Sequence, residues 1–477
     1  MIQFQKVIRL LGTLSVLICN VAVASAQFET RATAPVLLSP LSIAVGDFNH
    51  DSKLDMAIAS QGSNSAQLTI LLGNGDGTFR PGVHYNVTDD LYSVAAADFN
   101  GDGNLDLVVA DYLAGSVSVL MGNGDGTFQA AVSYSVHPGP IFVAVGDFNG
   151  DRWPDIVALE STDTCRCVSV LLNNKDGTFG TTHDTTIPFP YGMSIGIGDF
   201  NRDSRLDVAV AGQFESTGAL QVFLGNGDGS FSLGATYQIP FATPSSIAVA
   251  DFRGDGKMDL AVANNLGGAI SIFLGNGDGT FQGQVDYSVA FPETVATADF
   301  NGDGKLDLVA ANNNSPVSSA VVLLGNGDGT FQTGVSYPLG KEANFVTVGD
   351  FNGDKKLDLA TTNYLNNNVT MLFNTGVVTF SPTTPLNFHK QAVGTTSTPQ
   401  TVTLTNTGKS VLTISSMKAT GQFGMTSTCG SSIAAGANCA INVTFSPQTK
   451  GPKGGTVTIR DSASSKPQMI ELSGTGT

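Results

Sequence analysis

The sequence predicts an all-β protein, namely a seven-bladed β-propeller followed by an Ig-like β-sandwich. Three observations predict this fold class: a nonapeptide that recurs at a nearly fixed interval, apolar runs of strand length between Asx and Gly turns, and a change of pattern near residue 377. Self-similarity at a fixed period marks a repeat architecture. The 477 residues are 41% hydrophobic but only 13% charged, and 56 are glycine, a composition that suits turn-rich β structure.

Residues 1–26 have the pattern of a secretory signal. Lys6 and Arg9 precede an apolar run from Leu10 to Val23, and the small residues Ala24-Ser25-Ala26 close the segment. No later segment has the apolar length of a membrane span. We therefore expect a secreted or cell-surface protein with no transmembrane segment in the mature chain.

Residues 27–376 contain the repeat that predicts the propeller. The nonapeptide Asp-Phe-Asn-Gly-Asp-Gly-Lys-Leu-Asp, or a near copy, begins at intervals of 48 to 52 residues, at Asp47, Asp98, Asp147, Asp199, Asp251, Asp299 and Asp350. An apolar run precedes each copy and two follow it, and an Asn-Gly-Asp-Gly turn then leads into a fourth run. Four such runs predict a four-stranded antiparallel meander, and meanders repeated radially form a propeller.

The seventh repeat lacks its fourth run, since the chain changes pattern after Phe373-Asn374-Thr375-Gly376. The missing strand is expected at the other end of the chain. Phe28 precedes Asp47 by 19 residues, just as Phe79 precedes Asp98. We predict that Gln27 to Val36 completes the last blade and closes the ring, which leaves no open sheet edge.

The nonapeptides, called Asp loops below, have oxygen-bearing side chains at positions 1, 3, 5 and 9. Hard cations such as Ca²⁺ take such oxygen ligands, and the backbone carbonyl at position 7, as at Lys53, would add a fifth. An EF-hand is excluded because its twelfth position should be Glu, whereas the second loop has Val109, and because β-rich runs flank the loops. The alternative to cation binding is that the aspartates serve only to form Asx turns. The predicted ligands are Asp47, Asn49, Asp51 and Asp55; Asp98, Asn100, Asp102 and Asp106; Asp147, Asn149, Asp151 and Asp155; Asp199, Asn201, Asp203 and Asp207; Asp251, Asp255 and Asp259; Asp299, Asn301, Asp303 and Asp307; and Asp350, Asn352, Asp354 and Asp358.

Blade five departs from this pattern, because Arg253 stands where the other loops have asparagine. A guanidinium cannot ligate a cation. Its loop is either a weak calcium site or is filled by an internal ion pair. The Asn-Gly-Asp-Gly turns are a favoured hairpin type, and turn formation is the better explanation of their aspartates.

Residues 377–477 show period-2 alternation, as in Thr401 to Leu404 and Ala440 to Phe445, which predicts a small Ig-like sandwich. In an exported protein a disulfide between Cys429 and Cys439 is the default expectation. Cys165 and Cys167 are only two residues apart, a spacing that seldom gives good disulfide geometry, so free thiols and a strained local bridge both stay open.

These motifs resemble known families. The Asp loops, together with Leu-Leu-Gly-Asn-Gly-Asp-Gly-Thr-Phe hairpins, resemble FG-GAP/VCBS repeats, the propeller repeats of integrin α-chains. Thr428-Cys429-Gly430 through Asn438-Cys439, followed by Val443-Thr444-Phe445-Ser446-Pro447, resembles the abnormal-spindle/hydin-type Ig-like domain of "choice-of-anchor D" surface proteins. The resemblance implies extracellular adhesion or ligand binding and names no ligand.

The expected function is adhesion or binding of an extracellular protein or glycan, without enzymatic activity. A net charge of −17 excludes a nucleic-acid partner, which needs a basic face. The five histidines do not recur in the repeat, and no nucleophile elbow or zinc motif is present, so we predict no enzyme. The alternatives are a lectin, or less favoured a polysaccharide lyase with a Ca²⁺-loaded propeller.

The binding face is predicted from topology. The Asp loops and Asn-Gly-Asp-Gly hairpins lie at one end of the meander, while the loops that differ in every repeat lie at the opposite end, where recognition is expected. The alternatives are packing between blades for the aromatic residues and turn formation for the polar ones. The candidates are Tyr112, Phe189, Tyr191, Phe214, Phe241, Phe291, Phe345 and Tyr364, with the polar set Ser60, Asp111, Glu160, Asn264, Asn312 and Asn363.

Overall fold

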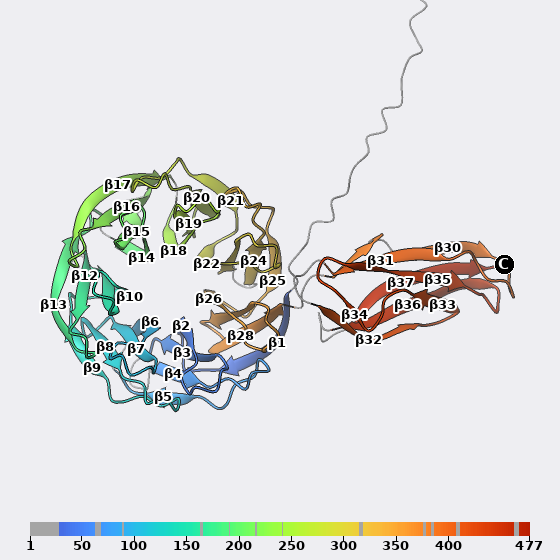
Figure 1. Cartoon of the computed structure of the whole chain (residues 1–477), viewed down its shortest axis with the longest axis horizontal. Coiled ribbons are helices and arrows are strands. Elements are labelled where there is room, and N and C mark those ends of the chain that lie inside the picture. The colour runs from blue at the N-terminus through green and yellow to red at the C-terminus, as the bar shows by residue number, and fades with distance from the viewer. Residues whose placement is uncertain are drawn as a thin grey trace, which may run out of the picture.

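A computed structural model describes residues 28–62, 68–87, 90–162, 166–189, 191–214, 217–240, 242–313, 318–374, 378–382, 386–406, 411–461 and 467–477. The predicted signal segment, residues 1–26, lies outside them. Every regular element of the described chain is a strand, so no apolar helix of membrane-spanning length occurs there. Figure 1 shows a ring of blades and a separate, elongated C-terminal unit.

Seven four-stranded antiparallel sheets form the ring, as the sequence predicts. The first strands are β2 (Pro40–Gly46), β6 (Leu91–Ala97), β10 (Pro140–Gly146), β14 (Tyr191–Gly198), β18 (Pro244–Ala250), β22 (Pro292–Ala298) and β26 (Ala343–Gly349). The second strands are β3 (Asp55–Ser60), β7 (Asp106–Asp111), β11 (Asp155–Ser161), β15 (Asp207–Phe214), β19 (Asp259–Asn264), β23 (Asp307–Asn312) and β27 (Asp358–Asn363). Each second strand therefore begins at the ninth residue of an Asp loop.

The outer half of each blade consists of a third and a fourth strand. The third strands are β4 (Leu68–Leu71), β8 (Ser116–Leu120), β12 (Arg166–Asn173), β16 (Thr217–Gly225), β20 (Ala269–Phe273), β24 (Ser319–Leu323) and β28 (Asn368–Asn374). The fourth strands are β5 (Val83–Tyr85), β9 (Val132–Ser135), β13 (Phe179–Thr186), β17 (Phe231–Ile239), β21 (Val285–Ser288), β25 (Val335–Pro338) and β1 (Phe28–Pro35). Second and third strands are almost wholly buried because both faces pack on neighbouring blades, whereas several fourth strands alternate toward solvent.

The first strand of the chain closes the ring. β1 pairs antiparallel with β28, from Phe28 opposite Asn374 to Pro35 opposite Asn368, and so completes the sheet of β26, β27 and β28. This confirms the closure predicted from the orphan run near Phe28. The N-terminal strand thus covers an edge that would otherwise present unpaired backbone groups.

A phenylalanine pair joins each blade to the next. The Phe at position 2 of an Asp loop meets the Phe that lies at or shortly before the start of the fourth strand of the following blade, as in Phe48 with Phe128, whose ring centroids lie 5.5 Å apart. Phe28 makes the same edge-to-face contact with Phe300 at 5.6 Å, which shows that β1 occupies an ordinary fourth-strand place. Such pairs contribute about 0.5–1.5 kcal/mol each beyond the area they bury. The remaining pairs are Phe79–Phe351, Phe99–Phe179, Phe148–Phe231, Phe200–Phe281 and Phe252–Phe331.

The C-terminal unit consists of two sheets around one core. One sheet contains β29 (Val378–Ser381), β31 (Gln400–Asn406), β35 (Asn438–Phe445) and β33 (Phe423–Ser427), and the other contains β30 (Leu386–Gln391), β37 (Gln468–Gly476), β36 (Gly451–Asp461), β32 (Leu412–Ala419) and β34 (Ser432–Ile433). Val402, Ile441, Val443, Val457 and Ile459 are fully buried between them. The strict alternation of apolar and polar residues follows from sheets with one face on the core and one in water.

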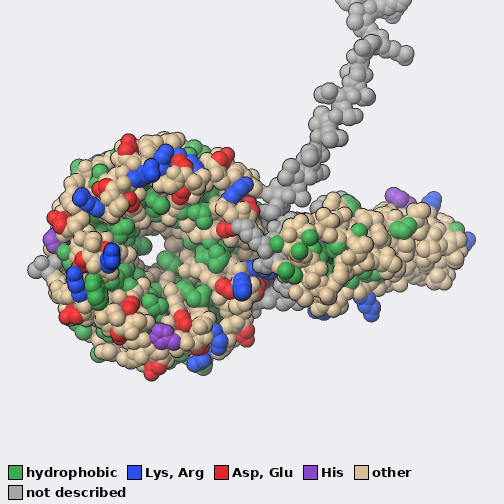
Figure 2. Space-filling view, viewed as in Figure 1, with side chains coloured by type: hydrophobic (Ala, Val, Ile, Leu, Met, Phe, Trp, Pro, Cys, Tyr) green, Lys and Arg blue, Asp and Glu red, His purple; other side chains and the backbone are tan. Residues whose placement is uncertain are grey.

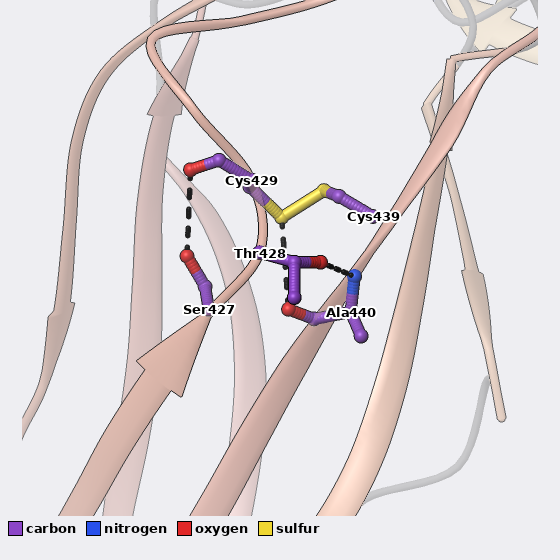
Figure 3. The surroundings of a disulfide bond; sticks show 5 residues. All are labelled: Ser427, Thr428, Cys429, Cys439 and Ala440. Carbon is purple, nitrogen blue, oxygen red and sulfur yellow. Dashed lines mark hydrogen bonds between the residues drawn. A yellow bond between two sulfur atoms is a disulfide. The ribbon is translucent and has the colours of Figure 1, made fainter.

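Two cysteines join neighbouring segments of this sandwich. Cys429 and Cys439 form a disulfide, and Thr428 beside it accepts the Ala440 amide at 2.8 Å (Figure 3). In the propeller, Cys167 of β12 is also disulfide-bonded, whereas Cys165 lies outside the described residues.

Candidate metal loops and a channel-mouth pocket

The Asp loops share one backbone shape. Positions 4 and 6 are left-handed in every loop: in the second loop they are Gly101 (φ 73°) and Gly103 (φ 87°). Glycine tolerates this conformation without a Cβ clash. Other side chains take it at a cost in four loops, for example His50 and Ser52 in the first. The turn directs the oxygens of positions 1, 3 and 5 toward the inside of the loop.

Loop amides and side-chain oxygens bond to one another in a fixed pattern. In the first loop, the Asp51 amide donates to both Asp47 Oδ1 (3.1 Å) and Asn49 Oδ1 (3.0 Å), and the Ser52 amide donates to Asp47 Oδ2 at 2.8 Å. The Lys53 amide donates to Asp51 Oδ1 at 3.1 Å. The residues predicted from sequence at positions 1, 3 and 5 are thus brought together.

The aspartate at position 9 ties the loop to its blade. Asp55 is fully buried, and its two oxygens accept the amides of Phe48 (2.9 Å) and Gly73 (2.7 Å). The same two bonds recur at Asp106, Asp155, Asp207, Asp259, Asp307 and Asp358. This role was not part of the sequence prediction.

Burial raises the pKa of these position-9 carboxyl groups, to about 6 for Asp106 and Asp155 and to about 7 for Asp307 and Asp358. The amide bonds act in the opposite sense, and the aspartates at positions 1 and 5 raise the pKa further by charge repulsion. Each loop therefore concentrates negative charge at a partly desolvated place, and a bound cation would offset that charge.

The donor chemistry fits a hard cation, since each intact loop offers only carboxylate, amide and carbonyl oxygens. Within the described residues, however, no three Asp, Glu, His or Cys side chains are gathered closely enough to form a metal-binding group. Their oxygens are directed at loop amides instead. A carboxylate oxygen that accepts one amide still has a free lone pair, so these bonds are compatible with a cation in the same loop.

Blade five replaces this arrangement with a guanidinium. Arg253 Nη2 lies 2.7 Å from Asp259 Oδ1 and 2.6 Å from the Gly275 carbonyl oxygen, and Nη1 lies 3.3 Å from Asp255 Oδ2. Its side chain is only 15% exposed. The positive charge thus reaches the aspartates at positions 5 and 9 from within the loop.

The Asn-Gly-Asp-Gly hairpins use their aspartates locally. Asp76 Oδ1 accepts both the amide and the hydroxyl of Thr78, at 2.9 and 2.6 Å. These bonds lower the pKa of Asp76, the hydroxyl bond most. The glycine that follows ties the hairpin to the preceding blade: the Gly126 amide donates to the Phe48 carbonyl at 2.9 Å. The hairpin aspartates therefore serve the turn and the blade contact.

At the opposite end, the polar set expected on the surface is buried inside the blades. Ser60, Asp111, Glu160 and Asn363 are fully buried, and Asn264 and Asn312 are nearly so. Asn264 Nδ2 donates to Ser271 Oγ at 2.7 Å, and that hydroxyl donates to Asp286 at 2.5 Å. These residues form polar rows across the strands and are not displayed for recognition.

The aromatic candidates divide into two groups. Phe189 is a core residue, while Tyr191 and Phe291 are nearly half exposed. Tyr112 stacks on Tyr92 with ring centroids 5.0 Å apart. Tyr364 donates a hydrogen bond to Gln61 at 3.3 Å. Phe241 and the side chain of Phe214 lie outside the described residues.

A pocket of about 310 Å³ opens at the mouth of the central channel, at the end of the variable loops. Figure 2 shows the central opening of the ring with hydrophobic side chains around it. All seven blades contribute to the channel mouth, which is lined by Leu41, Ser42, Gln61, Tyr92, Ser93, Phe142, Met193, Ser194, Ser245, Ser246, Glu293, Thr294, Asn313, Asn344 and Phe345. Among the residues predicted from sequence, only Phe345 belongs to this lining.

A ring of hydroxyl groups lies at the base of the channel mouth. Five blades place Ser or Thr five residues before the Asp loop, at Ser42, Ser93, Ser194, Ser246 and Thr294, and the other two place Phe142 and Phe345 there. Each hydroxyl oxygen accepts an amide of the next blade at 3.0–3.3 Å, as Ser42 does from Val94. The fixed spacing from the Asp loop is a signal by which the sequence could have identified this ring.

The chain belongs to the FG-GAP-like repeat family. Six overlapping matches to this family span residues 47–109, 98–158, 147–210, 199–262, 252–310 and 299–361. Residues 375–469 match the family described as "Abnormal spindle-like microcephaly-assoc'd, ASPM-SPD-2-Hydin". Both families agree with the resemblances in the sequence. No curated protein matched the chain in sequence.

Solved structures with a similar fold include a putative 6-phosphogluconolactonase from Bacteroides uniformis ATCC 8492. It shares 14% identity at a TM-score of 0.51 over 68% of this chain and 92% of its own. A periplasmic gluconolactonase from Pseudomonas aeruginosa matches at 17% identity and a TM-score of 0.45, over 64% and 86% of the two chains.

The first of these structures corrects the prediction that the chain is not an enzyme. That prediction was wrong to treat such a propeller as a binding scaffold alone, because a neighbour of this fold carries the name of an enzyme. The lack of a familiar catalytic motif is no argument in a fold of this kind. At 14% identity the likeness shows the fold alone, and no lactonase activity follows from it for this chain.

Proposed function

We propose that the protein is an exported, calcium-binding propeller that takes part in adhesion or extracellular ligand binding through its variable end. The observation that carries the proposal is the channel mouth, where residues from all seven blades meet in one pocket of about 310 Å³. Ligand pockets commonly begin near this size and combine apolar walls with a few polar groups. The partner would be an extracellular protein or a glycan.

Two features support export. The N-terminal sequence has a positively charged start, an apolar run and a small-residue end. The described cysteines Cys167, Cys429 and Cys439 are all disulfide-bonded, which suits an oxidising compartment. Export also supplies calcium at the concentrations that modest extracellular sites need.

Calcium is proposed for the six intact Asp loops on the strength of their all-oxygen donor sets and buried negative charge. The ion would supply positive charge where the turn brings carboxylates together. It would thereby offset the repulsion between the aspartates at positions 1 and 5 and the buried carboxylate at position 9. Its proposed role is structural, since the loops lie at the end of the propeller away from the channel mouth.

The direct test is an array of glycans and extracellular proteins probed with the calcium-loaded chain. We expect binding that is lost when residues of the channel mouth are changed, and retained when the Asp125 carboxylate of an opposite hairpin is changed to an amide. Binding that depends on the hairpin residue but not on the channel mouth would contradict the assignment of the face. Absence of any binding across both arrays would contradict the proposed function.

A further inference from the structure

The channel mouth has a polar lining without a cationic side chain. Eleven of its fifteen lining residues carry a hydroxyl, amide or carboxyl group, and none is Lys or Arg. An anionic ligand would meet Glu293 with no compensating positive charge. An apolar ligand would leave the surrounding hydroxyls and amides without partners, which is costly.

Glu293 is held by amides on one side. Its Oε1 accepts Asn265 Nδ2 at 2.6 Å and Asn313 Nδ2 at 3.4 Å, and Asn313 in turn donates to Asn344 Oδ1 at 3.3 Å. Burial raises the pKa of this carboxyl group. Two amides thus fix the direction of the side chain, and Oε2 remains available to accept a hydroxyl proton from a ligand.

The hydroxyl ring supplies donors at the base of the pocket. Each serine oxygen of the ring accepts a hydrogen bond from a backbone amide of the next blade. This bond fixes the position of the hydroxyl group relative to the strands. A hydroxyl that accepts an amide still carries its own proton and can donate it to a ligand oxygen. Ser42, Ser93, Ser194 and Ser246 all belong to this set.

Phe142 and Phe345 replace the hydroxyl in two blades. Both line the channel mouth and also a deeper cavity of about 340 Å³ in the same channel, whose other walls are Ser194, Ser246 and residues farther along β18, β22 and β26. The two phenyl rings therefore lie between the two spaces and offer apolar faces beside the hydroxyls. Flat apolar surface next to hydroxyl donors and a carboxylate acceptor matches a sugar ring, which has one apolar face and a rim of hydroxyls.

We propose that the channel mouth binds a neutral sugar residue at the end of a glycan. Glu293 accepts hydrogen bonds from its hydroxyls, the serine ring donates to its oxygens, and Phe142 and Phe345 contact its apolar face. A pocket of about 310 Å³ is large enough for a monosaccharide or a disaccharide. This inference rests on the proposed function and narrows its ligand class.

The test uses the full mature chain in calcium and a panel of free monosaccharides and disaccharides, followed by saturation-transfer NMR and titration calorimetry. The first variant is Glu293→Gln, which keeps an acceptor for Asn265 but removes the charge. The second is Phe345→Leu, which keeps apolar volume but removes the flat ring. Glu471→Gln is the control, because it removes an exposed carboxylate of the C-terminal sandwich at a residue that does not line the pocket. Melting curves establish that each variant is folded.

We expect at least one neutral sugar to bind, with affinity lowered about tenfold or more by Glu293→Gln and by Phe345→Leu and unchanged by Glu471→Gln. Sugar binding that none of the pocket variants alters would overturn the channel site while leaving the proposed function in place. Binding of proteins but of no sugar would overturn the ligand class. No ligand of either kind would overturn the proposed function as well.

Discussion

The two ends of the propeller use the same repeat in opposite ways. At the end with the Asp loops, seven copies keep the same turn, the same position-9 bonds and the same phenylalanine pair. At the end with the channel mouth, the seven copies supply Ser, Thr or Phe at one ring position and unrelated residues around it. The same residues recur where every blade packs against its neighbour, and the residues differ from blade to blade where side chains contact solvent or a ligand.

Arg253 is the one departure from the Asp, Asn, Asp, Asp pattern at positions 1, 3, 5 and 9 of the Asp loops, and it allows blade five to be compared with the other six. In four of the other loops the position-5 aspartate lies within 4.0 Å of a Lys or Arg side chain, as Asp51 does of Lys53, whereas in blade five a guanidinium inside the loop pairs with both Asp259 and Asp255. The loop bonds of blade five nevertheless persist: the Asp255 and Gly256 amides still donate to Asp251. The turn can therefore form with an internal cation.

The largest effect is expected from calcium removal, which acts on the uniform end alone. A ligand present at about 100 times its dissociation constant stabilises the fold by roughly 2.7 kcal/mol per site. With six intact loops we expect EDTA to lower the melting temperature by more than about ten degrees. We expect elemental analysis to find close to six calcium ions per chain. Calorimetry with and without EDTA measures the shift. Two or fewer ions, or unchanged melting, would contradict calcium in these loops.

The next effect concerns Glu160, a buried carboxyl group near the variable end. Burial raises its pKa to about 8, the neighbouring Ser169 hydroxyl opposes this shift, and the charge of Asp184 adds to it. By strict geometry neither carboxyl oxygen has a hydrogen-bond partner among the described residues. A raised pKa means that the carboxyl group of Glu160 stays protonated to higher pH in the folded chain than in the unfolded chain. The contribution of Glu160 to the stability of the fold is complete below its pKa in the unfolded chain, near 4.5. That contribution is lost as the pH rises through about 8.

Glu160→Gln removes this dependence, since glutamine stays neutral like Asn264 and Asn363 in the corresponding places. We expect the wild-type chain to lose stability relative to the variant between pH 5 and 9, by about 1.4 kcal/mol for each pH unit that separates the pKa of Glu160 in the folded chain from its pKa in the unfolded chain. Denaturant titrations across this range measure the difference, with the exposed Glu471→Gln as control. Parallel pH profiles would show that Glu160 is ionised in the fold.

Arg253→Asn sharpens the comparison between blade five and its neighbours. Without calcium the variant leaves buried Asp259 uncompensated, and breaking such a pair costs about 3–5 kcal/mol where both groups are desolvated. We expect melting below wild type in EDTA, recovery in calcium, and one additional bound ion. Lys257→Ala is the control, because it removes a positive charge from the same loop at a partly exposed position, 3.5 Å from Asp255. An unchanged ion count would show that the third ligand alone does not make the site.

The uniform end was predictable because its signals are local. Blade number, ring closure and the turn follow from spacings around the Asp loop, and the structure places Phe28 and Asp47 as those spacings require. The burial of Ser60 and Glu160 was not predictable in the same way, because a polar residue at a strand end looks alike whether it faces solvent or a neighbouring blade. Glu293 and Asn344 occupy the same repeat position on neighbouring blades, six residues before Asp299 and Asp350, but the residue at this position changes from blade to blade, so its type gave no repeated signal.

The smallest effect on stability is expected at Tyr112, where the measured property is ligand binding. Its ring packs against the ring of Tyr92, which lines the channel mouth, so Tyr112 helps to hold Tyr92 in place. Such ring pairs contribute about 0.5–1.5 kcal/mol. We expect Tyr112→Ala to weaken a ligand of the channel mouth by up to about tenfold with little change in melting, and Tyr112→Phe, which keeps the ring, to bind normally. Titration calorimetry with the bound ligand measures both. Equal losses in the two variants would show that the hydroxyl and not the stacked ring matters, and loss of binding in Asp125→Asn instead would show that the two ends have been assigned in reverse.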